Sequence, residues 1–467
     1  MVSELSAELT SWVESTVGGK IVASRSIPAG GRLGSFVDVE TAGERLELFL
    51  QQGRGAAFRG TSLFQAFDLE AEVMRALEAI GIPVPHVWAL DPERDLLLVS
   101  RVSGGVWFRP PQDPSEALSV AQDFVAHLAA WHRVGAASLE LPSFGPVRSL
   151  REHQQDQLDG IEKLMRENTT PDTVDPIVSE SLAWLRANIP AVDGPVVLVQ
   201  GDTGPGNFLH EGGRVTGVVD WELAHLGDPM DDIAWLSWRS TQHDFPDLPE
   251  RLREYEKLSG ITVDVDRVLY YRLNAFGRLG PWFGLADLGL RPQAARGAGG
   301  TDGDRSADGT LLLMSMLHRR MRLEATSAVM GLPIPSRDVV EPPLPGHDRL
   351  YDQVLEQLAA IGAETTDRKT GNRAKAAART IKHLRELDRS GEVFGAAERD
   401  HLAELLGRSA DSVETKPARR ELVAAVKAGT VSFEDYVDYQ WRRLRHEDHL
   451  MRTASGALYD RSWPALV

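Results

Sequence analysis

The chain has 467 residues, which is too long for one ordinary hydrophobic core, so we expect two or three domains. Its formal net charge of -17 disfavours a nucleic-acid or anionic-membrane partner, because both attract clustered Lys and Arg. The chain has no cysteine, which excludes disulfides, thiolate metal sites and a cysteine nucleophile.

The N-terminal stretch MVSELSAELTSWVES is acidic and amphipathic, without the basic and then apolar order of a signal peptide. The longest apolar runs, such as GTLLLMSML, are much shorter than a membrane span. We therefore expect a soluble, cytoplasmic protein with no nucleic-acid and no membrane partner. The sequence leaves the oligomeric state open.

Residues 20–50 have the alternation of apolar and polar residues that is typical of strands. Paired glycines in SIPAGGRLGSF indicate a turn between the strands KIVAS and FVDVE, and ERLELFLQ follows as a third strand. From Phe67 the apolar residues recur at helical spacing until Gly81 ends the helix. The apolar run DLLLVSRV is then a short buried strand. This order predicts a small α+β lobe, the N-lobe, over residues 1–102.

Residues 103–335 are predicted to be a mainly helical C-lobe, as in SEALSVAQDFVAHLAAWHRV, whose apolar residues form one stripe. The strand PVVLVQ and the hairpin NFLHEGGRVTGVVDW interrupt these helices once. In GDPMDDIAWLSW, Asp228 is the expected N-cap of a helix and Pro229 its first residue. Capping and the helix dipole explain the acidic residues Asp231 and Asp232 that follow.

The proline-rich stretch GLPIPSRDVVEPPLPGHD is expected to be a linker. Residues 345–467 beyond it are charged, amphipathic and predicted to be helical. We expect them to form a C-terminal α-helical bundle that packs as a semi-independent unit. The fold class is therefore α+β, with domains at 1–102, 103–335 and 345–467.

Three polar side chains that suit metal and acid–base chemistry flank the hairpin in VVLVQGDTGPGNFLHEGGRVTGVVDWELAHLGDP. A hairpin brings its two ends together, so Asn207 before its first strand faces Asp220 at the end of its second. Amide and carboxylate oxygens suit Mg²⁺, which shares its remaining ligands with water and phosphate. Asp202 is placed to orient and deprotonate a substrate hydroxyl. A turn or cap role is the alternative for each residue taken alone.

The complete pattern resembles the aminoglycoside phosphotransferase and choline kinase-like family, which are small-molecule kinases with a bilobal protein-kinase-like fold. The resemblance extends over about residues 18 to 330 and rests on GDxxxxN, the hairpin, VVDWE and GDP. It also includes GGRLGS as the nucleotide loop, FDLEAEVMRALEAIGIPVPHV as the Glu-bearing helix, and LLLVSRVSGG as the interlobe hinge. The segment DWELAHLGDP resembles the branch of kinase-like domains found with acyl-CoA dehydrogenases.

The resemblance implies a role for each matching residue. Asp202 would be the catalytic base, and Asn207 and Asp220 the Mg²⁺ ligands. Glu70 would pair with a cation that anchors phosphate. The other implied nucleotide-binding residues are Gly30, Gly31, Arg32, Gly34, Ser35 and Ser100. Glu222 and His225 are weaker candidates for lining the acceptor pocket, and a loop role is the alternative.

Two residues depart from the family pattern. Gln200 replaces the usual histidine of HGD, at a position that supports the loop, so a hydrogen-bonding amide is an acceptable substitute. Phe49 stands where relatives carry Lys or Arg on the third strand, and a phenyl ring cannot neutralise phosphate. We therefore expect Arg32 or Arg25 to reach toward Glu70 instead; Arg54 is a further candidate.

The expected reaction is Mg²⁺-dependent transfer of the γ-phosphate of ATP or GTP to a hydroxyl of a small molecule. The alternative is a catalytically weak or inactive pseudokinase that binds a ligand or acts as a scaffold. Antibiotic resistance is a third interpretation, which rests only on the best-known members of the family. The acceptor, the choice between ATP and GTP, and the role of the C-terminal helices are left open.

Overall fold

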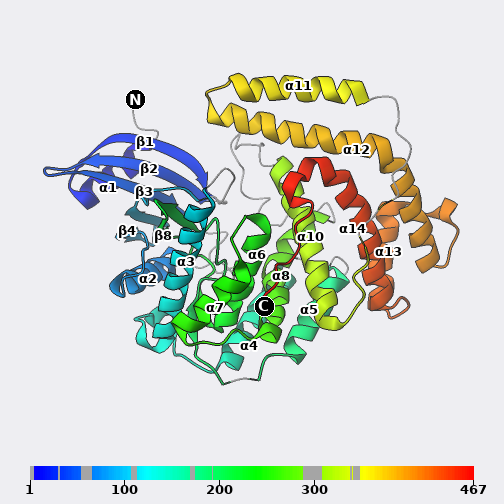
Figure 1. Cartoon of the computed structure of the whole chain (residues 1–467), viewed down its shortest axis with the longest axis horizontal. Helices are drawn as coiled ribbons and strands as arrows, with labels where there is room; N and C mark the ends of the chain where they lie inside the picture. Colours follow the sequence, from blue (N-terminus) through cyan, green and yellow to red (C-terminus); the bar gives the residue numbers. More distant parts are fainter. Residues whose placement is uncertain are drawn as a thin grey trace. The chain divides into compact units, whose positions relative to one another are not determined.

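The computed structural model describes residues 5–29, 32–53, 66–106, 113–168, 174–191, 193–287, 308–336, 339 and 348–467 (Figure 1). The chain divides into two compact units, which are described separately here. The first comprises Met1–Leu164, Asn188–Ala275 and Trp463–Val467, and the second comprises Met165–Ala187 and Phe276–Ser462. The main sheet is antiparallel and confined to residues 20–100, and most of the remaining described chain is helical, so the α+β prediction is confirmed.

The N-lobe of the first unit contains a five-stranded antiparallel sheet of order β1-β2-β3-β5-β4. The strands are β1 (Lys20–Ala29), β2 (Arg32–Glu40), β3 (Arg45–Gln52), β4 (Val87–Asp91) and β5 (Leu96–Ser100). Alternate residues of the sheet, such as Val37, Val39, Leu48 and Leu50, pack against Val13 of helix α1 (Ala7–Val17). The predicted strands are present, and β4 was missed because prolines precede it.

Helix α2 (Phe67–Ala79) begins at the predicted residue and buries Val73 and Leu77. Glu70 lies on the same buried side and is only 3% exposed. Helical spacing alone favours an exposed charged face for Glu70 and Glu72. A buried carboxylate needs a partner, because removing a charge from water is costly.

The C-lobe of the first unit consists mainly of helices around buried aromatic residues such as Trp131 and Trp235. The helices are α3 (Pro114–Val134), α4 (Leu150–Asn168), α6 (Pro229–Gln242), α7 (Leu248–Ser259) and α8 (Val265–Asp287), with short 3₁₀ turns η2 (Ala136–Ser138) and η3 (Pro142–Phe144). The C-terminal ends of α4 and α8, from Met165 and Phe276, belong to the second unit. Helix α6 has the predicted start, since Asp228 caps it by accepting a hydrogen bond from Met230 N at 2.9 Å.

Two small strand pairs interrupt these helices. Strands β7 (Phe208–Glu211) and β8 (Arg214–Val218) form the predicted hairpin, and Phe208 pairs with Val218. Gly212 and Gly213 form its turn with φ values of 57° and 78°, which glycine adopts without steric cost. Strands β6 (Val197–Val199) and β9 (His225–Gly227) pair beside it.

The second unit is helical. Its elements are α5 (Pro176–Ala187), α10 (Asp308–Met330), α11 (Asp348–Glu364), α12 (Arg368–Leu405), η5 (Ala410–Ser412), α13 (Thr415–Lys427), α14 (Phe433–Ser455) and η6 (Gly456–Leu458). Its core joins residues of α10 to residues of α12, α13 and α14, including Leu323, Leu402, Leu422 and Trp441. Helix α10 thus groups with the C-terminal helices, whereas the sequence boundaries place it in the C-lobe. Those boundaries stay a prediction.

No helix in the described part of the chain is long and apolar enough to span a bilayer.

Candidate functional site

The hairpin brings the three predicted side chains together. Val219 N donates to Asn207 O at 2.9 Å, so Asn207 lies beside the strand end that carries Asp220. The Nδ2 group of Asn207 donates to the carbonyl oxygen of Asp202 at 2.8 Å, which closes the loop GDTGPGN. This bond uses the amide nitrogen and leaves Oδ1 of Asn207 to accept a further contact.

A buried carboxylate of α6 anchors the loop GDTGPGN, a role that the sequence did not reveal. Asp232, fully buried on α6, accepts hydrogen bonds from Gln200 N at 2.9 Å, Gly201 N at 3.0 Å and Thr203 Oγ1. His132 of α3 contacts the same carboxylate at 3.1 Å. Asp232 lies in the predicted first turn of α6, but its partners show that it anchors the loop as well.

Burial by itself would raise the pKa of Asp232, but the hydrogen bonds and charge of His132 and the bonds from Thr203 and Gly201 hold that pKa below its usual value. The carboxylate therefore stays ionised and fixes the loop through charge-assisted bonds. Gln200 acts as predicted, since its Nε2 donates to Val219 O at 2.7 Å and ties the loop to the hairpin.

Asp202 is paired with an arginine that the sequence analysis missed. Arg239 of α6 donates through Nε to Oδ1 at 2.7 Å and through Nη2 to Oδ2 of Asp202. Gly204 and Gly206 make room for it: a Cβ on Gly204 would lie 2.8 Å from Arg239 Cβ, and a Cβ on Gly206 would lie 3.4 Å from Arg239 Nη1. Both glycines also have positive φ, at 132° and 102°. The glycine pattern of the loop was the available signal.

Arg32, the first residue of β2, makes the contact that the sequence predicted. Its Nη1 and Nη2 groups donate to Oε2 and Oε1 of Glu70 at 3.0 and 2.5 Å. Nη2 also lies 3.2 Å from Oε2 of Glu222. The guanidinium packs 4.5 Å from the ring centre of Phe67 and is largely buried. Arg25, the other candidate, instead lies over the ring of Phe36 at 5.0 Å.

A cavity of about 320 Å³ opens between the N-lobe and the hairpin. Its walls are apolar toward Phe49, Met74 and Val99, and polar toward Arg32 and Asp220. Phe49 packs against Phe36 with ring centres 5.2 Å apart and supplies wall rather than charge. The volume lies in the range of small-molecule sites, which combine apolar walls with a few polar groups.

Asp220 has an unusual electrostatic environment. Crowding by surrounding protein and the negative charges of Glu222, Asp202 and Glu70 raise its pKa to about 8, although Arg239 acts in the opposite direction and the residue keeps an exposed surface. Its φ of 63° is rare for a residue other than glycine, and it turns the carboxylate toward the cavity that it lines. Asp220 has no hydrogen-bond or ion-pair partner within the described residues, so a cation at this point would relieve the repulsion.

The donor set fits Mg²⁺ better than a metal held by protein alone. Among the described residues no group of three or more His, Cys, Asp or Glu side chains is arranged to hold a metal. Asn207 and Asp220 instead offer one amide and one carboxylate oxygen. This matches Mg²⁺, which uses one or two carboxylates and takes its other ligands from phosphate and water.

Of the remaining predicted site residues, only some line the cavity. Ser100 lines the cavity at the end of β5, whereas Gly34 and Ser35 lie on β2 and do not. His225 is buried in β9, with its ring nitrogens bonded to Leu223 O and to Asp231, so it has a structural role and is not part of the described cavity wall. Gly30, Gly31 and Arg54 lie outside the described residues.

Parts of this chain are similar in sequence to known proteins. Acyl-CoA dehydrogenase family member 11 of Homo sapiens is 29% identical over 181 residues, which cover 36% of this chain and 22% of that protein. Hygromycin-B 4-O-kinase of Escherichia coli is 28% identical over 207 residues, or 40% of this chain and 58% of that enzyme. The chain therefore spans less than two thirds of the length of either relative.

The fold has a counterpart among solved structures. A Ralstonia eutropha protein classed as an aminoglycoside phosphotransferase superposes with a TM-score of 0.50 at 21% identity, over 69% of this chain and 97% of that chain. The bilobal kinase-like fold is thereby confirmed. A sequence model of the phosphotransferase enzyme family matches residues 26–267. Since this match covers more than half of the chain, the chain belongs to the phosphotransferase enzyme family.

Proposed function

We propose that the chain is a Mg²⁺-dependent small-molecule kinase that transfers the γ-phosphate of ATP or GTP to a hydroxyl group. The observation that carries this proposal is the gathering of Asp202, Asn207 and Asp220 beside the Arg32–Glu70 pair. Together these groups supply a base, two metal ligands and a phosphate anchor. A cytoplasmic location belongs to the same proposal, because the cytosol supplies nucleoside triphosphates.

The cavity offers a place for each part of the nucleotide. The apolar wall at Phe49, Met74 and Val99 suits a purine ring, and Ser100 at the end of β5 offers its hydroxyl hydrogen to the ring edge, since its N–H is donated to His86 O. The triphosphate then extends toward Arg32, whose guanidinium can bind two oxygens at once. Glu70 and Glu222 hold Arg32 at this end of the cavity.

In the proposed reaction, Asp202 orients the acceptor hydroxyl and accepts its proton. The hydroxyl oxygen forms a bond to the γ-phosphorus while the bond from phosphorus to the β–γ bridging oxygen breaks, so ADP or GDP leaves. Arg239 fixes the Asp202 carboxylate in one orientation. Asn207 and Asp220 would hold Mg²⁺, which neutralises charge on the phosphates.

One observation favours a second candidate, the pseudokinase. Phe49 occupies the cavity wall where relatives carry a strand cation. A chain in which Arg32 serves only to neutralise Glu70 and Glu222 would bind a ligand without turnover. The intact set of Asp202, Asn207 and Asp220 favours the active enzyme.

Nucleotide binding is the first test, because a ligand that binds only the folded state raises its stability. We expect ATP or GTP to raise the melting temperature of the full chain only with Mg²⁺ present. Asp220→Ala should abolish this shift, and the exposed Asp266→Asn on α8 should retain it. If no nucleotide changes the melting temperature, with or without Mg²⁺, the proposal is contradicted.

Turnover is the second test and separates kinase from pseudokinase. Asp202→Asn should keep nucleotide affinity and lose the transfer of phosphate to an identified acceptor, because the base acts on the acceptor. Nucleotide binding without transfer to any hydroxyl compound in a broad screen would favour the pseudokinase. Unchanged turnover in Asp202→Asn would exclude Asp202 as the base.

A further inference from the structure

The second unit contains a small basic cavity of about 160 Å³, well separated in sequence from the residues of the proposed kinase site. Two helices line it: α12 contributes Glu398 and His401, and α14 contributes the arginines of the sequence QWRRLRHED and His446. Its lining includes three arginines, Arg442, Arg443 and Arg445, and a single carboxylate.

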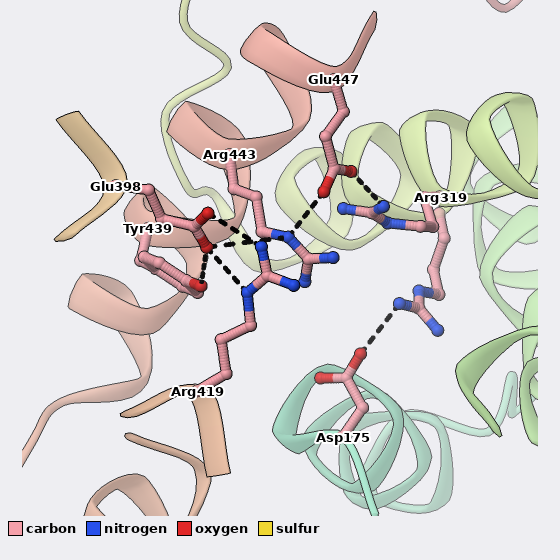
Figure 2. Close-up of polar contacts among 8 residues, drawn as sticks. Asp175, Arg319, Glu398, Arg419, Tyr439, Arg443 and Glu447 are labelled. Carbon is pink, nitrogen blue, oxygen red and sulfur yellow. Dashed lines mark hydrogen bonds and ion pairs between the residues drawn. The ribbon is translucent and has the colours of Figure 1, made fainter. Parts of the chain in front are cut away.

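The carboxylate of the cavity is already engaged. Glu398 accepts two hydrogen bonds from Arg419, each of 2.8 Å, and one from the hydroxyl of Tyr439 at 2.7 Å (Figure 2). Arg443 Nε lies 4.0 Å from Glu398 and donates to Glu447 at 2.8 Å. The Glu398 carboxylate is therefore not free to neutralise further positive charge.

The nearby carboxylates are engaged too. Glu447 also accepts a hydrogen bond from Arg319 (Figure 2). Asp438 pairs with Arg442 at 2.7 Å. Arg445 is thus left with positive charge at the cavity and no carboxylate in ion-pair contact within the described part of the chain.

Two buried nitrogens in the cavity lining have no hydrogen-bond partner among the described residues. These are Nε of Arg445, which is a donor, and Nδ1 of His401, which donates or accepts according to the tautomer; His401 is 9% exposed, and its Nε2 lies 3.8 Å from Asp438. A buried polar atom without a hydrogen bond is destabilising, so native structures seldom leave one unexplained. The unpartnered Arg445 donor and the three arginines of the lining indicate a ligand that accepts hydrogen bonds and carries negative charge.

We propose that this cavity binds a phosphate group, either as inorganic phosphate or as the end of a small phosphate ester. Guanidinium groups match phosphate oxygens in geometry and charge. The volume is below that of a site for a whole nucleotide, so a group of a few atoms is the appropriate size. The site is independent of the proposed kinase cavity and of the nucleotide that it would take.

Phosphate binding to the full chain tests this proposal. Inorganic phosphate and glycerol phosphate are titrated by calorimetry against chloride of equal ionic strength, with acetate as the carboxylate probe. We expect binding of at least one phosphate compound, and an increase of at least about tenfold in its Kd in Arg445→Gln. A preference for inorganic phosphate or for the ester identifies which source the cavity uses, and either supports the proposal.

Matched variants separate this cavity from the kinase site and from loss of folding. Arg420→Gln, an exposed residue of α13 outside the cavity, should leave the Kd unchanged. Arg32→Gln should also leave it unchanged, because Arg32 belongs to the other cavity. NMR signals of the His401 and His446 rings should shift on phosphate addition in the parent chain and not in Arg445→Gln.

Three outcomes overturn the proposal. They are binding that Arg32→Gln removes and Arg445→Gln does not, equal binding of acetate, and the absence of any phosphate-dependent heat or ring shift in a chain with normal circular dichroism.

Discussion

At the scale of single residues, the proposed function makes Arg32 the phosphate anchor of the cavity that it lines. Phosphates close together in a cavity repel each other unless a cation lies nearby. We expect Arg32→Gln to raise the Kd for Mg²⁺–nucleotide at least about tenfold, measured by calorimetry. The control is Arg25→Gln, because Arg25 is exposed and contacts Phe36 rather than Glu70.

A compensating change makes this prediction sharper. Phe49 lines the same cavity, so Phe49→Lys in the Arg32→Gln background places an ammonium group within it. We expect the double variant to recover part of the lost affinity. If Arg32→Gln binds nucleotide as tightly as the parent chain, Arg32 is not the phosphate anchor.

Arg239 is the second residue whose effect can be predicted. It holds both carboxylate oxygens of Asp202 and contacts the loop at Gly204, so its removal should let the proposed base move. A displacement of about 1 Å at a reacting group can cost roughly 100-fold in rate. We expect Arg239→Gln to lower kcat on the order of 10- to 100-fold, with little change in nucleotide Kd.

Arg239→Lys keeps the positive charge, but its kcat should stay below that of the parent chain, because a lysine cannot bind two oxygens in a fixed plane. The measurement is kcat and KM for the acceptor together with nucleotide Kd. A loss of nucleotide affinity equal to the loss of kcat would show that Arg239 supports the fold of the loop rather than the base.

At the scale of elements, helix α6 shows what the sequence could and could not predict. Asn207 and Asp220 were predictable, because one hairpin of known turn chemistry brings them together. Asp228 was predictable as a cap, since capping is local. The loop anchor Asp232 and the partner Arg239 were not, because their partners lie 29 to 100 residues away and only tertiary packing selects them.

Helix α14 gives a prediction for pH. Burial would raise the pKa of Glu447, but the charges of Arg319 and Arg443 outweigh it and lower that pKa from 4.5 to about 2. A carboxyl group with a lowered folded pKa stabilises the fold above its unfolded pKa, and this stabilisation disappears as pH falls toward the folded value. We therefore expect Glu447→Gln to destabilise the chain near neutral pH and to matter progressively less from about pH 4.5 to about pH 2.

The measurement is the melting temperature of parent and variant across this pH range by calorimetry. Glu434→Gln, at an exposed position of the same helix, is the control and should track the parent chain at every pH. A constant difference between parent and Glu447→Gln down to the lowest pH would contradict the role given to Arg319 and Arg443.

At the scale of the whole molecule, the boundary predicted at residues 335–345 separates helices that share one hydrophobic core in the second unit. Linker composition is a local signal and predicted the separation of residues 345–467 from what precedes them. Burial is not local: Leu313 and Leu323 of α10 belong to the same core as Tyr436 and Trp441 of α14. The sequence could not reveal this shared core, because the apolar stripe of a helix predicts that the helix packs against a neighbour but not which neighbour.

Arg320 of α10 makes the consequence of truncation specific. Its side chain is 1% exposed and contacts Asp448 at 3.1 Å, and it also donates to the backbone oxygens of Leu458 and Arg461. A chain ending after residue 340 would lose all these partners and leave a buried charge unpaired, at a cost of about 3 to 5 kcal/mol. It would also expose the apolar face of α10.

We therefore expect the chain ending at residue 340 to aggregate or to bind a hydrophobic dye, as judged by light scattering and dye fluorescence. Deletion of α11 is the control, because none of the residues of α11 is buried, and that variant should remain soluble. A soluble, monomeric chain ending at residue 340 with an unchanged melting transition would instead place the energetic boundary at the linker. In that case the contacts of Arg320 with Asp448 would contribute little to stability, because water would solvate the guanidinium once α14 is gone.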